Sequence, residues 1–126
     1  MQAFDHERLE VYQSALRFVV VAREIIEQLP GGFADLADQL GRASTSRVLN
    51  TAEGAGQFSK REKARFYRMA KRSATECAGV LDIFRVLQAI EDKPLLAGRE
   101  LLLGIVSNAY SARAKPSRTG HGQGQG

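Results

Sequence analysis

The residues of this chain whose types and spacing could support chemistry are mainly arginines. Four of them recur at intervals of 4, 3 and 4 residues: Arg61, Arg65, Arg68 and Arg72. On an α-helix this spacing places all four on one face. Three lysines lie beside that face: Lys60, Lys63 and Lys71. Such a stripe could neutralise several phosphates of a nucleic-acid backbone, which gives salt-sensitive binding without reading the base sequence.

Two other interpretations of the arginine stripe stay open. A helix face rich in Lys and Arg can simply be solvated, or it can form salt bridges with an acidic part of a neighbouring copy. Residues 57–76 carry a balance of +5 and residues 1–56 a balance of −3, within a net charge of +4. The basic character is therefore concentrated in one segment, which fits either a phosphate ligand or an acidic partner.

The sequence gives little support for a catalytic site, a metal site or a cofactor. His6 and His121 lie near opposite ends of the chain, and no glutamate is followed three residues later by histidine, as di-iron bundles require. The only cysteine, Cys77, permits neither an intrachain disulfide nor a thiolate metal cage, and it fits a small core residue. The Gly54-Ala55-Gly56-Gln57 run lacks the later glycine and lysine of a phosphate loop. We expect no enzymatic activity, no metal, no cofactor and no small-molecule substrate.

Hydrophobic periodicity predicts four helices, at about residues 7–29, 33–53, 59–91 and 95–113. Pro30, Gly31 and Gly32 should end the first helix, and a left-handed Gly54 the second. No alternating run predicts a strand. The expected fold is an all-α, antiparallel up-down-up-down four-helix bundle over residues 1–113. Residues 114–126 form a Gly/Gln-rich basic tail that we expect to be disordered.

Two helices show a clear apolar stripe. In the first helix the expected inner residues are Leu9, Tyr12, Leu16, Val19 and Ile26. In the third they are Phe66, Ala70, Ser73, Cys77, Val80, Phe84 and Leu87. Ser59 and Glu62 have the spacing of a capping box at the start of the third helix. A 4, 3, 4, 3 stripe of this kind favours nearly parallel helix axes.

A short connection should make the second and third helices antiparallel neighbours, with Ser46 opposite Tyr67. Ser46, Asn50 and Glu53 then share a stripe near the hairpin, where buried polar groups need hydrogen bonds. Their expected role is structural, ahead of a role in ligand binding or catalysis. An ion pair between Glu76 and Arg42 is also expected to join the two helices.

These residues also carry a family resemblance. The matching positions are Gln39, Arg42, Ser46, Asn50, Glu53, Gly54, Ser59, Glu62, Phe66, Ala70, Ser73 and Glu76. The chain resembles, over roughly residues 4–110, the bacterial four-helix-bundle proteins, also called the 23S rRNA intervening-sequence proteins. The resemblance implies a four-helix protomer that assembles into a ring, a pentamer, without established catalytic activity. A distantly similar bundle is the accessory protein of diversity-generating retroelements, which works with nucleic acid and a reverse transcriptase.

The chain departs from that family pattern at four positions. Gly41 stands where a basic residue is usual, and Arg72 where glycine is usual. Arg47 and Thr51 stand where apolar β-branched residues are usual. If Arg47 and Arg72 point outward, they add positive charge beside the third helix. If they point inward, the packing or the ring contact differs from the family.

Two functional hypotheses follow. The first is a non-enzymatic, homo-oligomeric accessory protein that binds RNA or DNA through Arg61, Lys63, Arg65, Arg68, Lys71 and Arg72. The alternative is an oligomeric scaffold that binds a protein partner and uses the basic stripe for assembly. The longest apolar run is far shorter than the roughly 18 residues of a spanning helix, so no membrane contact is expected. A single cysteine fits a reducing compartment, and we expect a cytoplasmic protein.

Overall fold

The computed structural model describes residues 4–104, all of whose regular elements are helices. The elements are the 3-10 helix η1 (Asp5–Arg8) and four α-helices: α1 (Glu10–Gln28), α2 (Ala34–Ala55), α3 (Lys60–Val86) and α4 (Asp92–Gly104). The all-α prediction is confirmed. The predicted last part of the fourth helix, residues 105–113, and the tail, 114–126, lie outside the described residues. Within residues 4–104, no helix combines the length and apolarity needed to cross a membrane.

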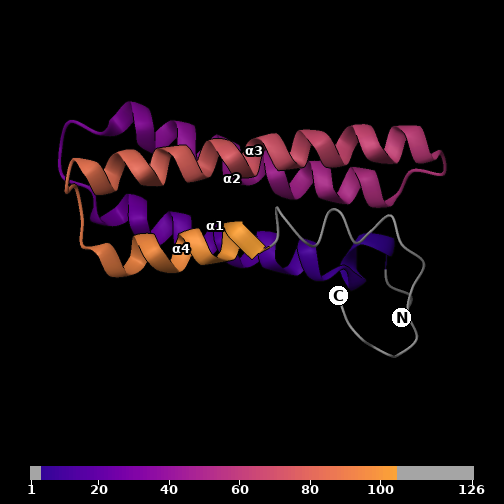
Figure 1. The fold of residues 1–126 in the computed structure, drawn as a ribbon, viewed down its shortest axis with the longest axis horizontal. Helices are drawn as coiled ribbons and strands as arrows, with labels where there is room; N and C mark the ends of the chain where they lie inside the picture. The colour runs from indigo at the N-terminus through magenta and orange to yellow at the C-terminus, as the bar shows by residue number, and fades with distance from the viewer. Residues whose placement is uncertain (1–3, 105–126) are drawn as a thin grey trace.

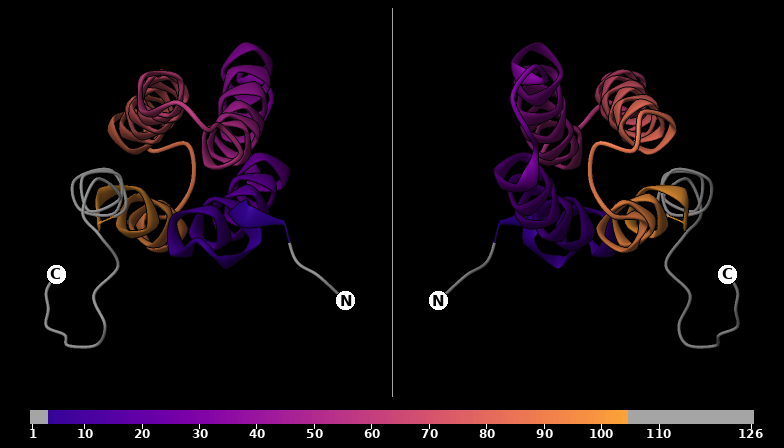
Figure 2. Two further views of the ribbon diagram at one scale, coloured as in Figure 1. Left: turned by 90° about the vertical axis from the view of Figure 1, so that its right-hand side faces the viewer. Right: turned by 90° about the vertical axis from the view of Figure 1, so that its left-hand side faces the viewer.

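Each α-helix packs against its neighbours in the chain, and α4 closes on α1. The α2–α3 pair lies along the α1–α4 pair, and the α1–α2 and α3–α4 connections share one end of the molecule (Figure 1). The α2–α3 connection lies at the opposite end (Figure 1). Seen end-on, the helices occupy four corners around a common centre (Figure 2). This leaves each helix one face for the core and one for solvent.

The end of α1 follows the predicted proline signal. Leu29 is extended, with φ −70° and ψ 138°, as a residue before proline prefers. Gly32 has φ +97°, a value that glycine adopts without strain, and turns the chain toward α2. The start differs from the prediction, because an extended Leu9 divides the expected single helix into η1 and α1.

Helix α3 was predicted to continue to Glu91 but ends at Val86. Gln88 has φ +53°; its N–H donates to the Arg85 carbonyl at 3.1 Å, and the Ala89 N–H donates to the Phe84 carbonyl at 2.9 Å. These two bonds form a Schellman motif, which satisfies carbonyls at the helix end. Glycine usually occupies the left-handed position, so a glutamine there gave no signal in the sequence.

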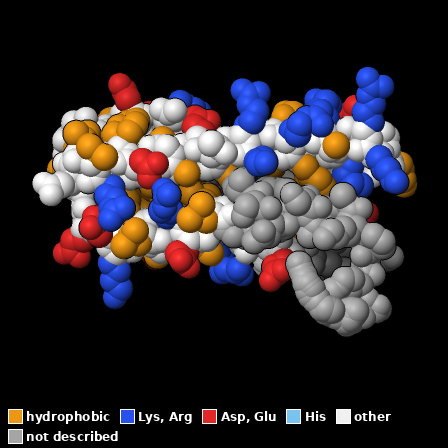
Figure 3. Space-filling model, viewed as in Figure 1, with side chains coloured by type: hydrophobic (Ala, Val, Ile, Leu, Met, Phe, Trp, Pro, Cys, Tyr) orange, Lys and Arg blue, Asp and Glu red, His pale blue; other side chains and the backbone are white. Residues whose placement is uncertain are grey.

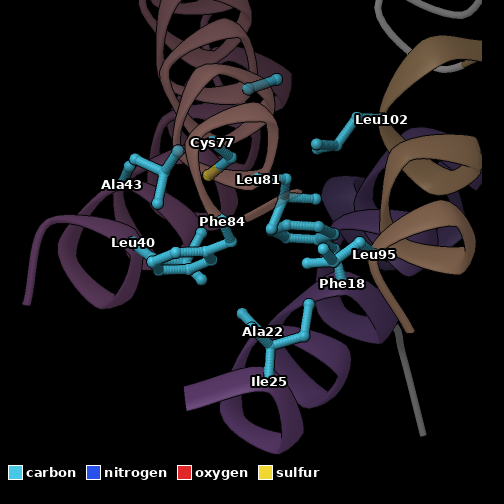
Figure 4. Close-up of a cluster of buried hydrophobic side chains, with 12 residues drawn as sticks. Phe18, Ala22, Ile25, Leu40, Ala43, Cys77, Leu81, Phe84, Leu95 and Leu102 are labelled. Atoms are coloured by element: carbon cyan, nitrogen blue, oxygen red, sulfur yellow. The ribbon is translucent and has the colours of Figure 1, made fainter. Parts of the chain in front are cut away.

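The apolar core lies toward the end that holds the α1–α2 and α3–α4 connections. Phe18, Leu40 and Phe84 are fully buried, and Phe33 meets Phe84 edge-to-face with ring centroids 5.9 Å apart. Side chains from all four α-helices converge here (Figure 4). This cluster joins α1, α2, α3 and α4 into one unit.

The inner face of α1 is shifted from the predicted one, although the predicted residue Ile26 does pack against the core. Its buried apolar residues are Val11, Ala15, Phe18, Ala22 and Ile25, whereas Leu16 is exposed. The small residues Ala15 and Ala22 face inward and let neighbouring helices approach. On α3 the prediction is largely confirmed, since Ala70, Ser73, Cys77, Val80 and Phe84 are buried, although Leu87 is exposed. Leu87 leaves the stripe because it is the last residue before the Schellman turn.

Gly54 does not cap α2, contrary to the prediction. It lies within the helix, which runs on to Ala55, and the capping Gly56 is right-handed with φ −88°. A Cβ atom on Gly54 would lie 2.7 Å from Cε1 of Tyr67 and 3.2 Å from Cβ of Phe66. The position needs glycine because α2 and α3 approach closely, and not because of its backbone conformation.

The pairing of α2 with α3 is antiparallel, but it is shifted from the expected register. The Ser73 hydroxyl lies 3.1 Å from the Ser46 hydroxyl, whereas Tyr67, the expected partner of Ser46, lies against Gly54. The Cα–Cβ bonds on each helix tilt toward its own N-terminus. Side chains of α2 therefore lean away from the hairpin and those of α3 lean toward it, so an α2 residue meets a partner farther along α3 than the Cα levels suggest.

Arg47 is the largest fully buried side chain in the part of the chain that the structure describes. None of its three guanidinium nitrogens has a hydrogen-bond partner within residues 4–104. The neighbouring Thr51 is also buried, and its hydroxyl donates to the Arg47 carbonyl at 2.8 Å. Of the two arginines that depart from the expected family pattern, Arg47 thus points inward while Arg72 is exposed. A guanidinium stays charged when buried, so this position costs stability.

The close contact at Gly54 predicts opposite effects for two Gly→Ala substitutions within helices. Gly54→Ala should lower the free energy of unfolding by about 1–3 kcal/mol, because the new methyl group overpacks against Tyr67. Gly79→Ala, in the exposed middle of α3 with no atom within 4 Å, should raise it by about 0.5–1 kcal/mol. Urea unfolding followed by circular dichroism measures both. Equal changes at the two sites would contradict the packing at Gly54.

The buried charge of Arg47 predicts a stabilising substitution. Arg47→Met keeps a long side chain and removes the buried charge, so it should raise the free energy of unfolding by about 1–4 kcal/mol. Thermal unfolding of the two proteins at equal concentration tests this. A lower midpoint for Arg47→Met would mean that the guanidinium is paired in solution.

Candidate functional site

Lys and Arg side chains gather over the part of α3 that adjoins the α2–α3 connection (Figure 3). This part of the helix starts at Ser59, whose hydroxyl accepts from the Glu62 N–H at 3.2 Å. The reciprocal half of the predicted capping box is absent in residues 4–104, since Glu62 instead accepts from Arg65. Ser59 therefore anchors the first turn from which the basic residues project.

The structure brings four predicted basic residues to one exposed face of α3, which we call the arginine face: Arg61, Arg65, Arg68 and Arg72. They span about 16 Å along the helix. Arg61, Arg68 and Arg72 form no ion pair with a carboxylate in the described part of the chain. Lys71 is exposed beside them and is likewise unpaired within residues 4–104. Their positive charge is thus available to a ligand.

Arg65 differs from the other three because its guanidinium is held in place. Its Nη2 and Nε donate to Glu62 Oε1 at 3.0 and 3.1 Å. Its Cζ lies 4.5 Å from the centroid of the Phe66 ring, a cation–π contact, and its Nη1 lies 3.8 Å from Met69 Sδ. The side chain keeps 49% of its exposure. Arg65 is therefore preorganised, and Glu62 offsets part of its charge.

Lys63 has a role in the fold that the sequence did not indicate. The half-buried side chain turns toward α2, and its Nζ donates to the carbonyls of Gly54 and Ala55 at 3.2 Å each. A cation at the last carbonyls of a helix is favoured by the helix dipole. The ammonium of Lys63 is thus engaged at the end of α2 and is not part of the arginine face.

A groove of about 920 Å³ runs beside the arginine face, between α2 and α3. Helix α3 contributes Arg65, Arg68, Met69, Lys71, Arg72, Ser73, Thr75 and Glu76, and α2 contributes Ser46 and Asn50. The Asn50 Nδ2 donates to the Ser46 carbonyl and hydroxyl at 2.9 and 3.1 Å. Ser46 and Asn50 thus form a polar edge to a groove whose other wall is basic.

The other predicted structural residues partly behave as expected. Gln39 Nε2 donates to Glu76 Oε2 at 3.0 Å and joins α2 to α3. The predicted Glu76–Arg42 ion pair is absent from the described residues, because Gln39 binds Glu76 instead and Arg42 is exposed. Glu53 is exposed and its carboxylate accepts no hydrogen bond from residues 4–104. The carbonyls of Gly54 and Ala55 at the hairpin accept from Lys63.

Cys77 and His6, which were considered for catalysis, pack against other side chains of the fold. Cys77 is fully buried, and burial raises the pKa of its thiol to about 12, although the nearby Arg47 guanidinium acts in the opposite direction. The thiol therefore stays protonated. His6 lies between Phe4 and Tyr12, with ring centroids 5.7 and 4.6 Å away, and His121 lies outside the described residues. In residues 4–104 no three His, Cys, Asp or Glu side chains are grouped to hold a metal.

The arginine face and the groove lie inside the part of the chain that matches a known family. Residues 7–105 match the family described as 23S rRNA-intervening sequence protein. The search of curated proteins found no match to this chain. The match includes α1, α2, α3 and α4 and every predicted site residue from Gln39 to Glu76.

The raised pKa of Cys77 predicts a loss of stability in alkaline solution. The unfolded thiol ionises near its ordinary pKa of 9.0 and the folded one near 12, so the folded state holds a proton that the unfolded state releases. The contribution of this thiol to the free energy of unfolding is fully present below pH 9 and falls by about 1.4 kcal/mol per pH unit above it. Urea unfolding at pH 8, 9.5 and 10.5 should show a steeper decline for the wild type than for Cys77→Ala. Parallel declines would contradict the burial of the thiol.

Proposed function

Because the chain belongs to the 23S rRNA-intervening sequence protein family, we propose that it is a non-enzymatic, homo-oligomeric accessory protein that binds nucleic acid. The ligand is RNA or DNA, and the contact is the arginine face of α3 together with Lys71. The observation that carries the proposal is that Arg61, Arg68 and Arg72 are exposed on one face and have no carboxylate partner in the described residues.

Phosphate is the ligand that suits this face best. A guanidinium offers a planar fork of donors that matches phosphate geometry, and several in a row follow a backbone of repeated phosphates. The four arginines lie about one helical turn apart, so no single small anion could engage them all. Contacts to phosphates carry no direct sequence information, so binding through this face is sequence-tolerant.

The proposed assembly is a ring, a pentamer, of antiparallel up-down-up-down bundles in the cytoplasm. A ring would repeat the arginine face once in each copy and multiply weak phosphate contacts. Exposed apolar side chains such as Val20 and Leu49 could be covered between copies. We propose no chemistry of its own for the protein, and the Cys77 thiol is buried and stays protonated.

A second candidate function is an oligomeric scaffold for a protein partner. A groove on the outer side of α2 favours it: Ile26, Ala37, Gly41 and Leu49 line this groove together with the polar Asp38 and Arg42. Leu49 is 58% exposed there. In this alternative the arginine face serves assembly rather than nucleic acid.

Reversing two unpaired charges should distinguish the candidates. Arg68→Glu with Arg72→Glu should weaken binding of a labelled single-stranded RNA or DNA at least tenfold at about 50 mM salt. The slope of log K against log salt should also fall by about two. A control, Arg17→Glu with Lys93→Glu, makes the same change in net charge on α1 and at the start of α4, where neither exposed side chain forms an ion pair within residues 4–104. Fluorescence anisotropy at about 50 and 300 mM salt measures the affinities.

The mass of the assembly provides the second readout for these variants. Light scattering should find the same oligomer for the wild type and both double variants. If both double variants bind nucleic acid equally weakly, only net charge matters. If the wild type binds no nucleic acid at low salt, the proposal is refuted. An oligomer that dissociates only in Arg68→Glu/Arg72→Glu would assign the face to assembly and favour the scaffold.

A further inference from the structure

Phe58 is the most exposed of the large hydrophobic side chains in the described part of the chain. Its relative exposure is 104%, against 79% for Val86, the next highest. It lies in the connection between α2 and α3, between Gln57 and the capping Ser59. Covering an aromatic ring is favourable, so a fully exposed ring such as that of Phe58 gains more from a stacking contact than a ring already buried.

The position of Phe58 relates it to the arginine face. It precedes Lys60, where α3 begins, by two residues and Arg61, where the arginine face begins, by three. Arg61 and Lys60 are themselves exposed. An aromatic ring therefore projects at the hairpin end of a basic track about 16 Å long.

Proteins that bind single-stranded nucleic acid combine these two features. A basic track follows the phosphates, and aromatic rings stack on bases that are not paired. In a duplex the faces of the bases are covered by their neighbours, so an exposed ring beside the track finds no base on which to stack. Resting on the proposed function, we propose that Phe58 stacks on an unpaired base of a single strand whose backbone follows the arginine face. The ligand class is then single-stranded RNA or DNA rather than a duplex.

Arg65 supports this ligand class independently. Its guanidinium lies over the Phe66 ring and is held by Glu62, yet the side chain remains 49% exposed. An arginine fixed in this way can stack on a second base as well as bind a phosphate. Phe58 and Arg65 lie seven residues apart, which is about two turns along the hairpin and helix.

The chain contains no tryptophan, so one introduced indole reports contact at one place. In Phe58→Trp, a 15-nucleotide single-stranded RNA or DNA at about 50 mM salt should quench the emission, because a base stacks on the indole. The same sequence as a duplex should leave the emission nearly unchanged. Val86→Trp, at the exposed far end of α3, is the matched control and should not be quenched by either.

Affinity measurements on variants without an introduced tryptophan complete the test. Phe58→Ala should weaken single-strand binding by about 5- to 100-fold with no change in the salt slope, whereas Phe58→Tyr should retain it. Val86→Ala should have no effect. If the wild type binds in a salt-dependent way but Phe58→Ala binds equally well, the stacking inference fails and the proposed function stands. If the wild type binds neither form, both fail.

Two more outcomes would overturn the inference. In the first, the wild type binds duplex and single strand with equal affinity, and Phe58→Ala weakens both equally. The ring would then contact something other than an unpaired base. A lower oligomer mass for Phe58→Ala in light scattering would show that Phe58 joins two copies of the chain.

Discussion

The ring of Tyr67 occupies the space that a side chain on residue 54 would need, and this contact holds the α2–α3 hairpin at a short interhelical distance. The Ser46–Ser73 and Gln39–Glu76 hydrogen bonds continue it along the pair. Together they set the rotation of α3 about its own axis. Once the inner face is directed at α2 and the core, the arginines must project on the outside. The arrangement of the basic residues thus follows from packing on the opposite side of the same helix.

The interior is uneven along the bundle. Aromatic and aliphatic side chains such as Phe18, Ile25 and Phe84 fill the end that holds the α1–α2 connection. Nearer the α2–α3 connection the buried residues include Arg47, Thr51 and other polar or small side chains. Within residues 4–104, the end that carries the arginine face therefore buries fewer large aliphatic side chains, although Tyr67 and Val48 are buried there.

The sequence predicted those parts of the fold that depend on periodicity and on strong local signals. The buried positions Ala70, Cys77 and Phe84 repeat at helical spacing, and Pro30 marks the end of α1 unmistakably. The family assignment was also confirmed. Positions set by a single tertiary contact could not be predicted in this way. Gly54 has the same local sequence whether it caps a helix or faces a ring across the hairpin.

The candidate site shows the same division. The helical spacing of Arg61, Arg68 and Arg72 suffices to place them on one exposed face, because it depends only on α3 being a helix. The partners of Lys63 and Glu76 depend on how far side chains reach between helices, and both differed from expectation. The left-handed Gln88 likewise has no local signature, since glycine is the usual residue there.

Helix α3 uses opposite faces for packing and for the arginine face. Ala70, Cys77 and Phe84 point into the bundle, and Arg61, Arg68 and Arg72 point out, so no position belongs to both sets. Substitutions on the outer face escape the volume limits that govern a packed interior. During evolution the outer face can therefore acquire, lose or exchange charges while the bundle is inherited unchanged. Members of one lineage can thus share this architecture and still diverge in what they bind.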